Sequence, residues 1–182
     1  MKKFILPSIF IGIILFFWQF VSFAGANLHS NAQQYTEKQD TILAFMNRLN
    51  IADGKYMIPM AQPNATQEQQ QKVHEANHGK PWMSFSYYQK MDVGMAKPMI
   101  RGLLSDIIAG LLLIFILNTI GPMAVSKSIS ICLALGFFAF IFIVYTNHIW
   151  YPTFDLWAYI IDAIVPYSII GFLNAKFWNK LG

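Results

Sequence analysis

The sequence predicts a mainly α-helical, polytopic membrane protein with about four transmembrane helices and a small α+β extracytoplasmic domain. Of its 182 residues, 55% are hydrophobic and 12% are charged, which is too apolar a composition for a soluble domain of this length. The apolar residues concentrate in four segments, each near the roughly 20 residues that cross a hydrocarbon core of about 30 Å. One long polar stretch, residues 27–98, separates the first segment from the others, and we expect it to fold outside the membrane.

The four expected transmembrane segments are similar in length, and only the third is slightly short. They cover residues 4–23, 99–117, 129–146 and 153–173. The chain therefore divides into an N-terminal helix (1–26), the outer domain (27–98) and a three-helix transmembrane bundle (99–182). The short connections in the last part favour an up-and-down arrangement of neighbouring helices.

Basic residues near the helix ends indicate the orientation, because Lys and Arg are preferentially retained on the cytoplasmic side. A cytoplasmic N-terminus places five lysines on that side: Lys2, Lys3, Lys127, Lys176 and Lys180. Arg101 is the exception to this grouping. The resulting orientation places the outer domain across the membrane from the cytoplasm.

The first segment also has features of a cleavable signal peptide. Lys2 and Lys3 form a basic start, and Ala24-Gly25-Ala26 has the small-x-small form of a cleavage site. The apolar run is longer than the roughly 7–15 residues of a signal-peptide core, which favours a retained helix. Both alternatives leave the same domain outside the cytoplasm.

The outer domain is expected to contain two short helices and two strands. One amphipathic helix is indicated by four apolar residues at helical spacing, which are Ile42, Phe45, Met46 and Leu49. Thr36 and Gln39 would form a capping box before it. We expect strands over residues 55–59 and 82–88 and a second helix over residues 65–77. Such a domain has a marginal core, so it should lean on the membrane helices or on a partner.

His74, Glu75 and His78 match the H-E-x-x-H pattern of zinc metallopeptidases, in which two histidines one helical turn apart bind zinc and the glutamate acts as general base. Lys72 and Lys80 flank the motif, although it normally lies in a buried apolar helix, and no third ligand is evident. We therefore interpret the motif as an exposed polar helix with two solvated histidines, and keep a metallopeptidase as an alternative.

Polar residues within the apolar segments are the other candidate site residues. These are Asp106, Asp155, Asp162 and, at a helix end, His148. A charged side chain near the bilayer centre costs at least about 2.5 kcal/mol on insertion scales, so each needs a compensating role. Asp106 is spaced four residues from Gly102 and from Gly110, a pattern of small residues that allows another helix to approach closely.

Two interpretations of these residues remain open. The carboxylates and the histidine could bind a proton or a cation for transport. Alternatively, the aspartates could form hydrogen bonds between helices, with Arg101 or His148 as partners, and fix the packing. The packing interpretation is favoured, because we see no internal repeat of the kind that transporters use for alternating access. The single cysteine, Cys132, is also expected to serve packing.

Several motifs resemble those of small uncharacterised bacterial inner-membrane proteins. They are Phe16-Phe17-Trp18, Gly54-Lys55-Tyr56-Met57-Ile58-Pro59, Gly79-Lys80-Pro81-Trp82 and Arg101-Gly102-Leu103-Leu104-Ser105-Asp106. Gly25-Ala26-Asn27-Leu28-His29 departs from the resemblance, because a more aromatic Pro-Trp-His stretch is expected there. The resemblance implies a bacterial inner membrane, a small periplasmic domain and a C-terminal three-helix bundle, and it implies no catalytic activity.

The sequence as a whole predicts a non-enzymatic membrane protein that acts with a membrane partner or an assembly. The expected partners are the lipid bilayer and another membrane protein or a second copy. Nucleic acid is not expected, because the Lys and Arg residues are scattered singly, and no cofactor is expected. Ion-coupled transport through the aspartates and zinc-dependent proteolysis are the alternatives.

Overall fold

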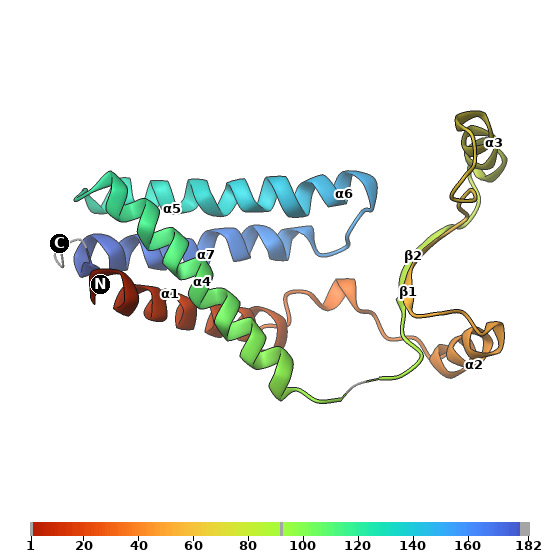
Figure 1. Cartoon of the computed structure of the whole chain (residues 1–182), viewed down its shortest axis with the longest axis horizontal. Helices are drawn as coiled ribbons and strands as arrows, with labels where there is room; N and C mark the ends of the chain where they lie inside the picture. Colours follow the sequence, from red (N-terminus) through yellow and green to blue (C-terminus); the bar gives the residue numbers. More distant parts are fainter. Residues whose placement is uncertain (1, 92, 179–182) are drawn as a thin grey trace. The chain divides into compact units, whose positions relative to one another are not determined.

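The computed structural model describes residues 2–91 and 93–178, so Lys180 lies outside the described residues. The chain is mainly helical, with one two-stranded sheet (Figure 1). It divides into two compact units: Met1–Gln34 together with Gly94–Gly182, and Tyr35–Val93. We call them the bundle unit and the polar unit. The first helix thus belongs to the same unit as the last three helices.

The bundle unit contains four helical spans that are long and apolar enough to cross a membrane. They are α1 (Lys2–Phe20) with η1 (Val21–Gly25), α4 (Ala96–Ile120), α5 (Val125–Ala139) with η3 (Phe140–Tyr145) and α6 (Thr146–Trp150), and α7 (Leu156–Lys176). The third span has 26 residues and is the longest, so the expectation that it is short was wrong. The error arose because α5 begins at Val125 and α6 continues the span to Trp150, so the helix extends past both ends of the expected residues 129–146.

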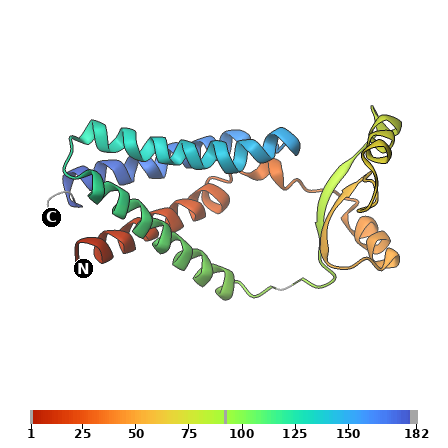
Figure 2. The ribbon, with the colours of Figure 1, turned by 45° about the horizontal axis from the view of Figure 1, so that its top comes forward.

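The spans pack as two pairs, α1 with α4 and α5 with α7 (Figure 2). Glycines allow these close contacts. A Cβ atom on Gly110 would lie 2.6 Å from the carbonyl oxygen of Ser8, and one on Gly136 would lie 2.7 Å from that of Ala163. The glycine pattern around Asp106 therefore packs against α1, as small residues do between membrane helices.

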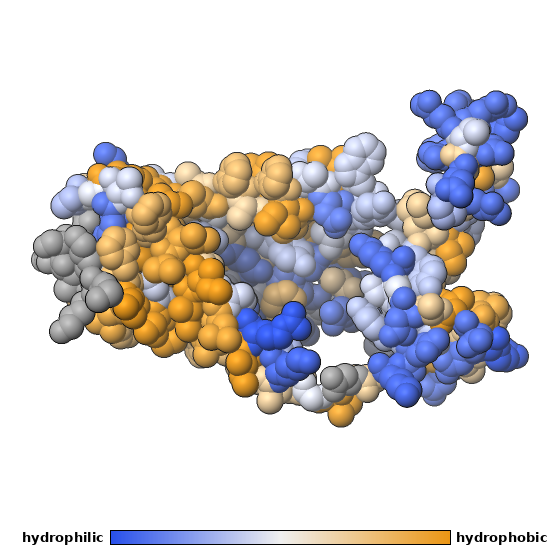
Figure 3. All heavy atoms as spheres, in the orientation of Figure 1, coloured by the Kyte–Doolittle hydropathy of each residue, from blue (hydrophilic) through white to orange (hydrophobic). Residues whose placement is uncertain are grey.

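An apolar core joins all four spans. Its buried members are Ile11, Leu113, Ile114, Leu117, Cys132 and Ile170. Cys132 is a free thiol within this core, which agrees with a packing role. The outer surface of the helices also carries large apolar side chains, and orange atoms cover much of the bundle unit in Figure 3. This combination suits helices that have lipid on their outer faces.

The bundle unit has two ends with different contents. At one end α1 begins, α4 turns into α5, and α7 ends (Figure 1), and Lys127 and Lys176 belong to this terminal end. At the other end, α1 leads toward the polar unit, α4 returns from it, and α6 is joined to α7. We call this second end the linker end.

The polar unit contains α2 (Gln39–Leu49), β1 (Gly54–Ile58), α3 (Gln67–Asn77) and β2 (Met83–Tyr87). The strands pair antiparallel, with Gly54 opposite Tyr87 and Ile58 opposite Met83. The order of elements agrees with the sequence prediction. The capping box, however, lies at Thr66 and Gln69 of α3, whereas α2 begins after Lys38 without a side-chain cap, so the box expected at Thr36 and Gln39 was wrong.

Candidate functional site

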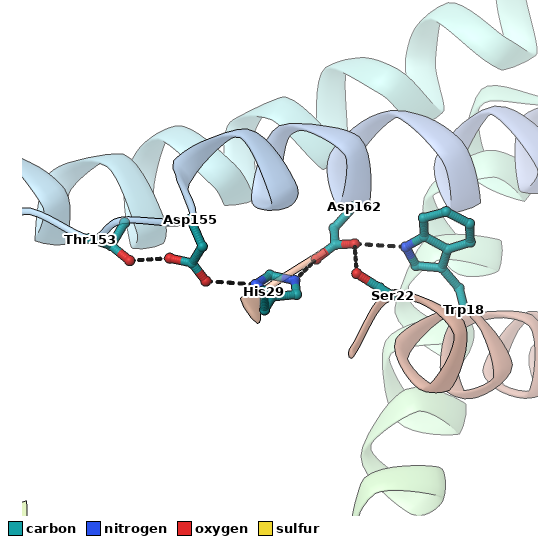
Figure 4. Close-up of polar contacts among 6 residues, drawn as sticks. All are labelled: Trp18, Ser22, His29, Thr153, Asp155 and Asp162. Carbon is teal, nitrogen blue, oxygen red and sulfur yellow. Dashed lines mark hydrogen bonds and ion pairs between the residues drawn. The ribbon is translucent and has the colours of Figure 1, made fainter. Parts of the chain in front are cut away.

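Two aspartates of the α7 region are bridged by one histidine at the linker end. His29 Nδ1 lies 2.7 Å from Asp155 Oδ2, and His29 Nε2 lies 3.0 Å from Asp162 Oδ2. Figure 4 shows these residues in a row, with the imidazole between the two carboxylates. Asp155 directly precedes α7, and Asp162 lies within it. We call His29, Asp155 and Asp162 the Asp-His-Asp cluster.

The backbone after α1 turns His29 back against α7. The π-helical turn η1 ends α1, and the Leu28 amide donates to the Ser22 carbonyl at 2.8 Å. Asn27 adopts a left-handed conformation with φ of 49°, which asparagine tolerates better than most residues. His29 then precedes the short 3-10 helix η2 (Ser30–Ala32). This turn explains why a residue outside the apolar segment reaches a carboxylate inside a membrane-length helix.

Asp162 has donors on both of its oxygens. Its Oδ1 accepts hydrogen bonds from Trp18 Nε1 at 2.9 Å and from Ser22 Oγ at 2.7 Å, while its Oδ2 faces His29. At 1.5 Å per residue, Asp162 lies about 9 Å inside α7 and Trp18 lies about 10 Å before Gly25. The two residues therefore meet at matching depths, and protein groups surround most of the Asp162 carboxylate, whose side chain is 23% exposed.

Asp155 is held by Thr153 and His29. The Thr153 hydroxyl contacts its Oδ1, and Oδ2 faces His29 (Figure 4). Burial raises the pKa of Asp155, but the hydrogen bonds from Thr153, His29 and its own backbone, with the charge of His29, outweigh burial. The pKa of Asp155 therefore lies below the ordinary value of 3.8.

Aromatic rings enclose the bridging histidine. The rings of Phe23 and His29 are stacked, with centroids 3.8 Å apart, and Tyr159 makes an edge contact at 4.7 Å. The side chains of His29 and Asp155 are only 5% and 2% exposed, whereas that of Asp162 is 23% exposed. Asp162 is therefore the least enclosed member of the cluster.

The contacts of His29 require one proton beyond that of a neutral imidazole. A neutral ring has one N–H donor and one lone pair, and an ionised carboxylate only accepts hydrogen bonds. If both aspartates were ionised around a neutral ring, a lone pair would face a carboxylate oxygen across 3.0 Å or less. Hydrogen bonds at both ring nitrogens therefore need one proton more than a neutral ring between two ionised carboxylates supplies, carried either by the imidazole or by a carboxyl group.

The cluster is poorly arranged for a metal ion, because its two carboxylates contact opposite nitrogens of one ring and do not converge. Within residues 2–91 and 93–178, no group of three or more His, Cys, Asp and Glu residues could hold a metal. His74 and His78 are both exposed, and α3 ends at Asn77, with His78 in an extended conformation. The two histidines thus do not share a helical face as the zinc motif requires.

The structure separates the other predicted site residues from this cluster or places them at its edge. Asp106 is buried between α4 and α1, where its Oδ1 accepts from Gln19 Nε2 at 3.1 Å. Its Oδ2 has no hydrogen-bond partner among the described residues. His148 Nδ1 accepts from the Thr153 amide at 3.0 Å, so it supports the loop that leads to Asp155.

Five polar partners of the aspartates were missed from the sequence, namely Trp18, Gln19, Ser22, His29 and Thr153. Trp18, Gln19 and Ser22 lie in the first apolar segment, where the tryptophan reads as an interface anchor and the others as isolated polar residues. The one available signal was His29, a histidine placed shortly after a membrane-length segment. Pairing it with α7 requires tertiary structure, because 126 positions separate it from Asp155.

Comparison of the chain with protein-family models, with curated proteins and with solved structures found no match. The resemblance to small bacterial inner-membrane proteins therefore stays a prediction.

Proposed function

We propose that this chain is a non-enzymatic, proton-responsive membrane protein in which the Asp-His-Asp cluster binds a proton. The observation that carries the proposal is the pair of contacts made by His29, 2.7 Å to Asp155 and 3.0 Å to Asp162, which needs a shared proton. The proton holds the segment after α1 on α7. Changes in pH then alter how firmly the chain leading to the polar unit is attached to the bundle unit.

The apolar core supports proton binding at one end of the bundle unit rather than conduction through it. Ile170 lies two turns beyond Asp162 on α7 and is fully buried, and Ile114 and Leu117 pack in the same core. The next buried polar pair on α7, Asn174 with Ser128 at 3.0 Å, lies at the terminal end. Aliphatic side chains, which neither donate nor accept a proton, therefore occupy most of the core between Asp162 and that end, where Tyr167 and the Cys132 thiol also pack.

The proposed location is a bacterial inner membrane, with the terminal end in the cytoplasm and the polar unit in the periplasm. Lys127 and Lys176 at the terminal end support this orientation through the preference of basic residues for the cytoplasmic side. In this orientation the cluster responds to the pH of the periplasm. Action together with a membrane partner or a second copy remains part of the proposal.

A spin label beside His29 tests the proposal in the full chain in phosphatidylcholine nanodiscs. Asn31 is exposed on η2, so an Asn31→Cys variant carries a nitroxide without entering the cluster. We expect low nitroxide mobility near neutral pH, higher mobility at alkaline pH, where the shared proton is lost, and high mobility at every pH with His29→Gln. Labelling of the unsubstituted chain, whose Cys132 is fully buried, gives the background.

A label at Gln71→Cys on exposed α3 is the matched control and should show no dependence on His29. Mobility at position 31 that is independent of both pH and His29→Gln would overturn the proposal. A proton flux through liposomes driven by a pH gradient and abolished by Asp162→Asn would replace it with transport.

A further inference from the structure

The apolar face of α2 is uncovered within the polar unit. Ile42, Phe45 and Leu49 are 50%, 51% and 52% exposed, although they lie on one side of the helix. The sequence predicted this face together with Met46, which is half-buried, and a core-facing role would have buried all four side chains. Tyr87 is the one buried apolar residue that the structure describes in the polar unit. The unit therefore forms no core around this helix.

The contact between α2 and the sheet uses the opposite side of the helix. Tyr87 donates its hydroxyl hydrogen to Asn47 Oδ1 at 2.6 Å, which joins α2 to β2. At 100° per residue, Asn47 lies about 140–160° around the helix from Ile42, Phe45 and Leu49. Attachment to the sheet thus points the apolar face away from the rest of the unit.

We propose that α2 lies in the lipid headgroup layer, with Ile42, Phe45 and Leu49 in the acyl boundary. An amphipathic helix with low overall hydrophobicity binds such an interface through its apolar face. Arg48 lies with its guanidinium 6.0 Å from the centre of the Phe45 ring, at the edge of that face. A long basic side chain in this position buries its stem and keeps its charge at the headgroups.

The connections of the polar unit keep α2 within reach of a bilayer. Gln39, the first residue of α2, follows Gln34 of the bundle unit by five positions, so this part of the chain spans at most about 18 Å. At the other side, Val93 is three residues from the start of α4 and spans at most about 11 Å. The bilayer is therefore a neighbour that the covalent structure supplies, without any partner protein.

The net charge of the polar unit bears on whether α2 needs anionic lipid for binding. Residues 35–93 contain equal numbers of basic and acidic residues, six of each. Electrostatic attraction to anionic lipid is then weak, and burial of the three apolar side chains supplies the attachment. Zwitterionic phosphatidylcholine should be sufficient as the surface.

Collision accessibility of spin labels tests this in the full chain, with one chain per phosphatidylcholine nanodisc. A label at Phe45→Cys should collide often with molecular oxygen, which concentrates in lipid, and rarely with an aqueous nickel chelate. The matched control is Ala44→Cys, an exposed position about 130° around α2 from the centre of the apolar face. Its label should show the reverse preference.

The same two labels identify the outcomes that overturn the proposal. Equal access of the nickel chelate to positions 44 and 45 would place the whole helix in water. Protection of position 45 from both reagents would mean that protein, from the bundle unit or a second copy, covers the face. The inference rests on α2 alone, so neither result bears on proton binding by His29.

Discussion

Asp162 and Asp106 are both carboxylates within membrane-length helices, but their surroundings differ. Asp162 Oδ1 receives hydrogen bonds from Trp18 and Ser22, and its Oδ2 faces His29. Asp106 receives a single hydrogen bond, from Gln19, and its second oxygen has no partner in the part of the chain that the structure describes. The partners of Asp162 compensate a negative charge on both oxygens, whereas one oxygen of Asp106 has no such compensation from the described residues.

The different numbers of hydrogen-bond partners distinguish Asp162, as part of a candidate functional site, from Asp106, as a packing contact between helices. A charge in a medium of low dielectric constant is tolerated when every lone pair that faces protein has a donor. Asp162 and Asp155 share such a set of polar partners, arranged around the imidazole of His29. Asp106 joins α4 to α1 through one amide hydrogen bond beside Gly110. The same residue type therefore has different roles in the two helices.

Removing the shared ring should have the largest effect. His29→Ala leaves Asp155 and one oxygen of Asp162 without their central partner, and breaking a buried ion pair in this way costs about 3–5 kcal/mol. We expect the free energy of unfolding of the full chain, measured by SDS titration in mixed micelles, to fall by that amount.

His74→Ala is the control for the loss of a histidine as such. His74 is exposed on α3, and surface substitutions usually change stability by less than about 0.5 kcal/mol. If His29→Ala were as mild as this control, the Asp-His-Asp cluster would not stabilise the fold, and its distinction from the Asp106 environment would fail.

The overall fold followed from the sequence because it depends on composition and local pattern. Apolar runs of membrane length and the alternating residues of β2 are properties of single segments, and both were found in the sequence within a few residues of their bounds. Errors occurred where local signals competed. Thr66 and Gln69 form the capping box that Thr36 and Gln39 could equally have formed, and α6 continues the third span beyond its expected end at residue 146.

The candidate site was predicted from the sequence only in part. Asp106, Asp155 and Asp162 are conspicuous because a carboxylate in an apolar run is costly, and this cost is visible in one segment. Except for Thr153, their partners come from a segment more than 80 positions away, and a turn at Asn27 brings His29 to α7. No local sequence pattern predicts both the turn at Asn27 and the part of α7 that His29 then contacts. His29 could therefore not be assigned to the aspartates from the sequence.

Protonation should remove the contribution of Asp155 to stability only at low pH, unlike that of a buried carboxylate without hydrogen-bond donors. Because the pKa of Asp155 is lowered in the folded chain, its contribution to stability is complete well above 3.8 and is lost as pH falls through the lowered value. The difference in free energy of unfolding between the parent chain and Asp155→Asn should therefore stay constant down to about pH 5. A difference that already shrinks between pH 7 and pH 5 would mean that burial dominates over the donors.

The smallest effect is expected at Asp106. Asp106→Asn keeps an oxygen that accepts from Gln19 and removes a charge whose second oxygen has no partner among the described residues. Replacing such a group is neutral or stabilising, so we expect the free energy of unfolding to change by less than about 1 kcal/mol or to rise. Asp162→Asn, measured in the same micelles, should cost more, because it removes the charge that Trp18, Ser22 and His29 compensate. A large loss of stability in Asp106→Asn would show that a group outside the described residues, such as a bound partner, supplies the missing donor.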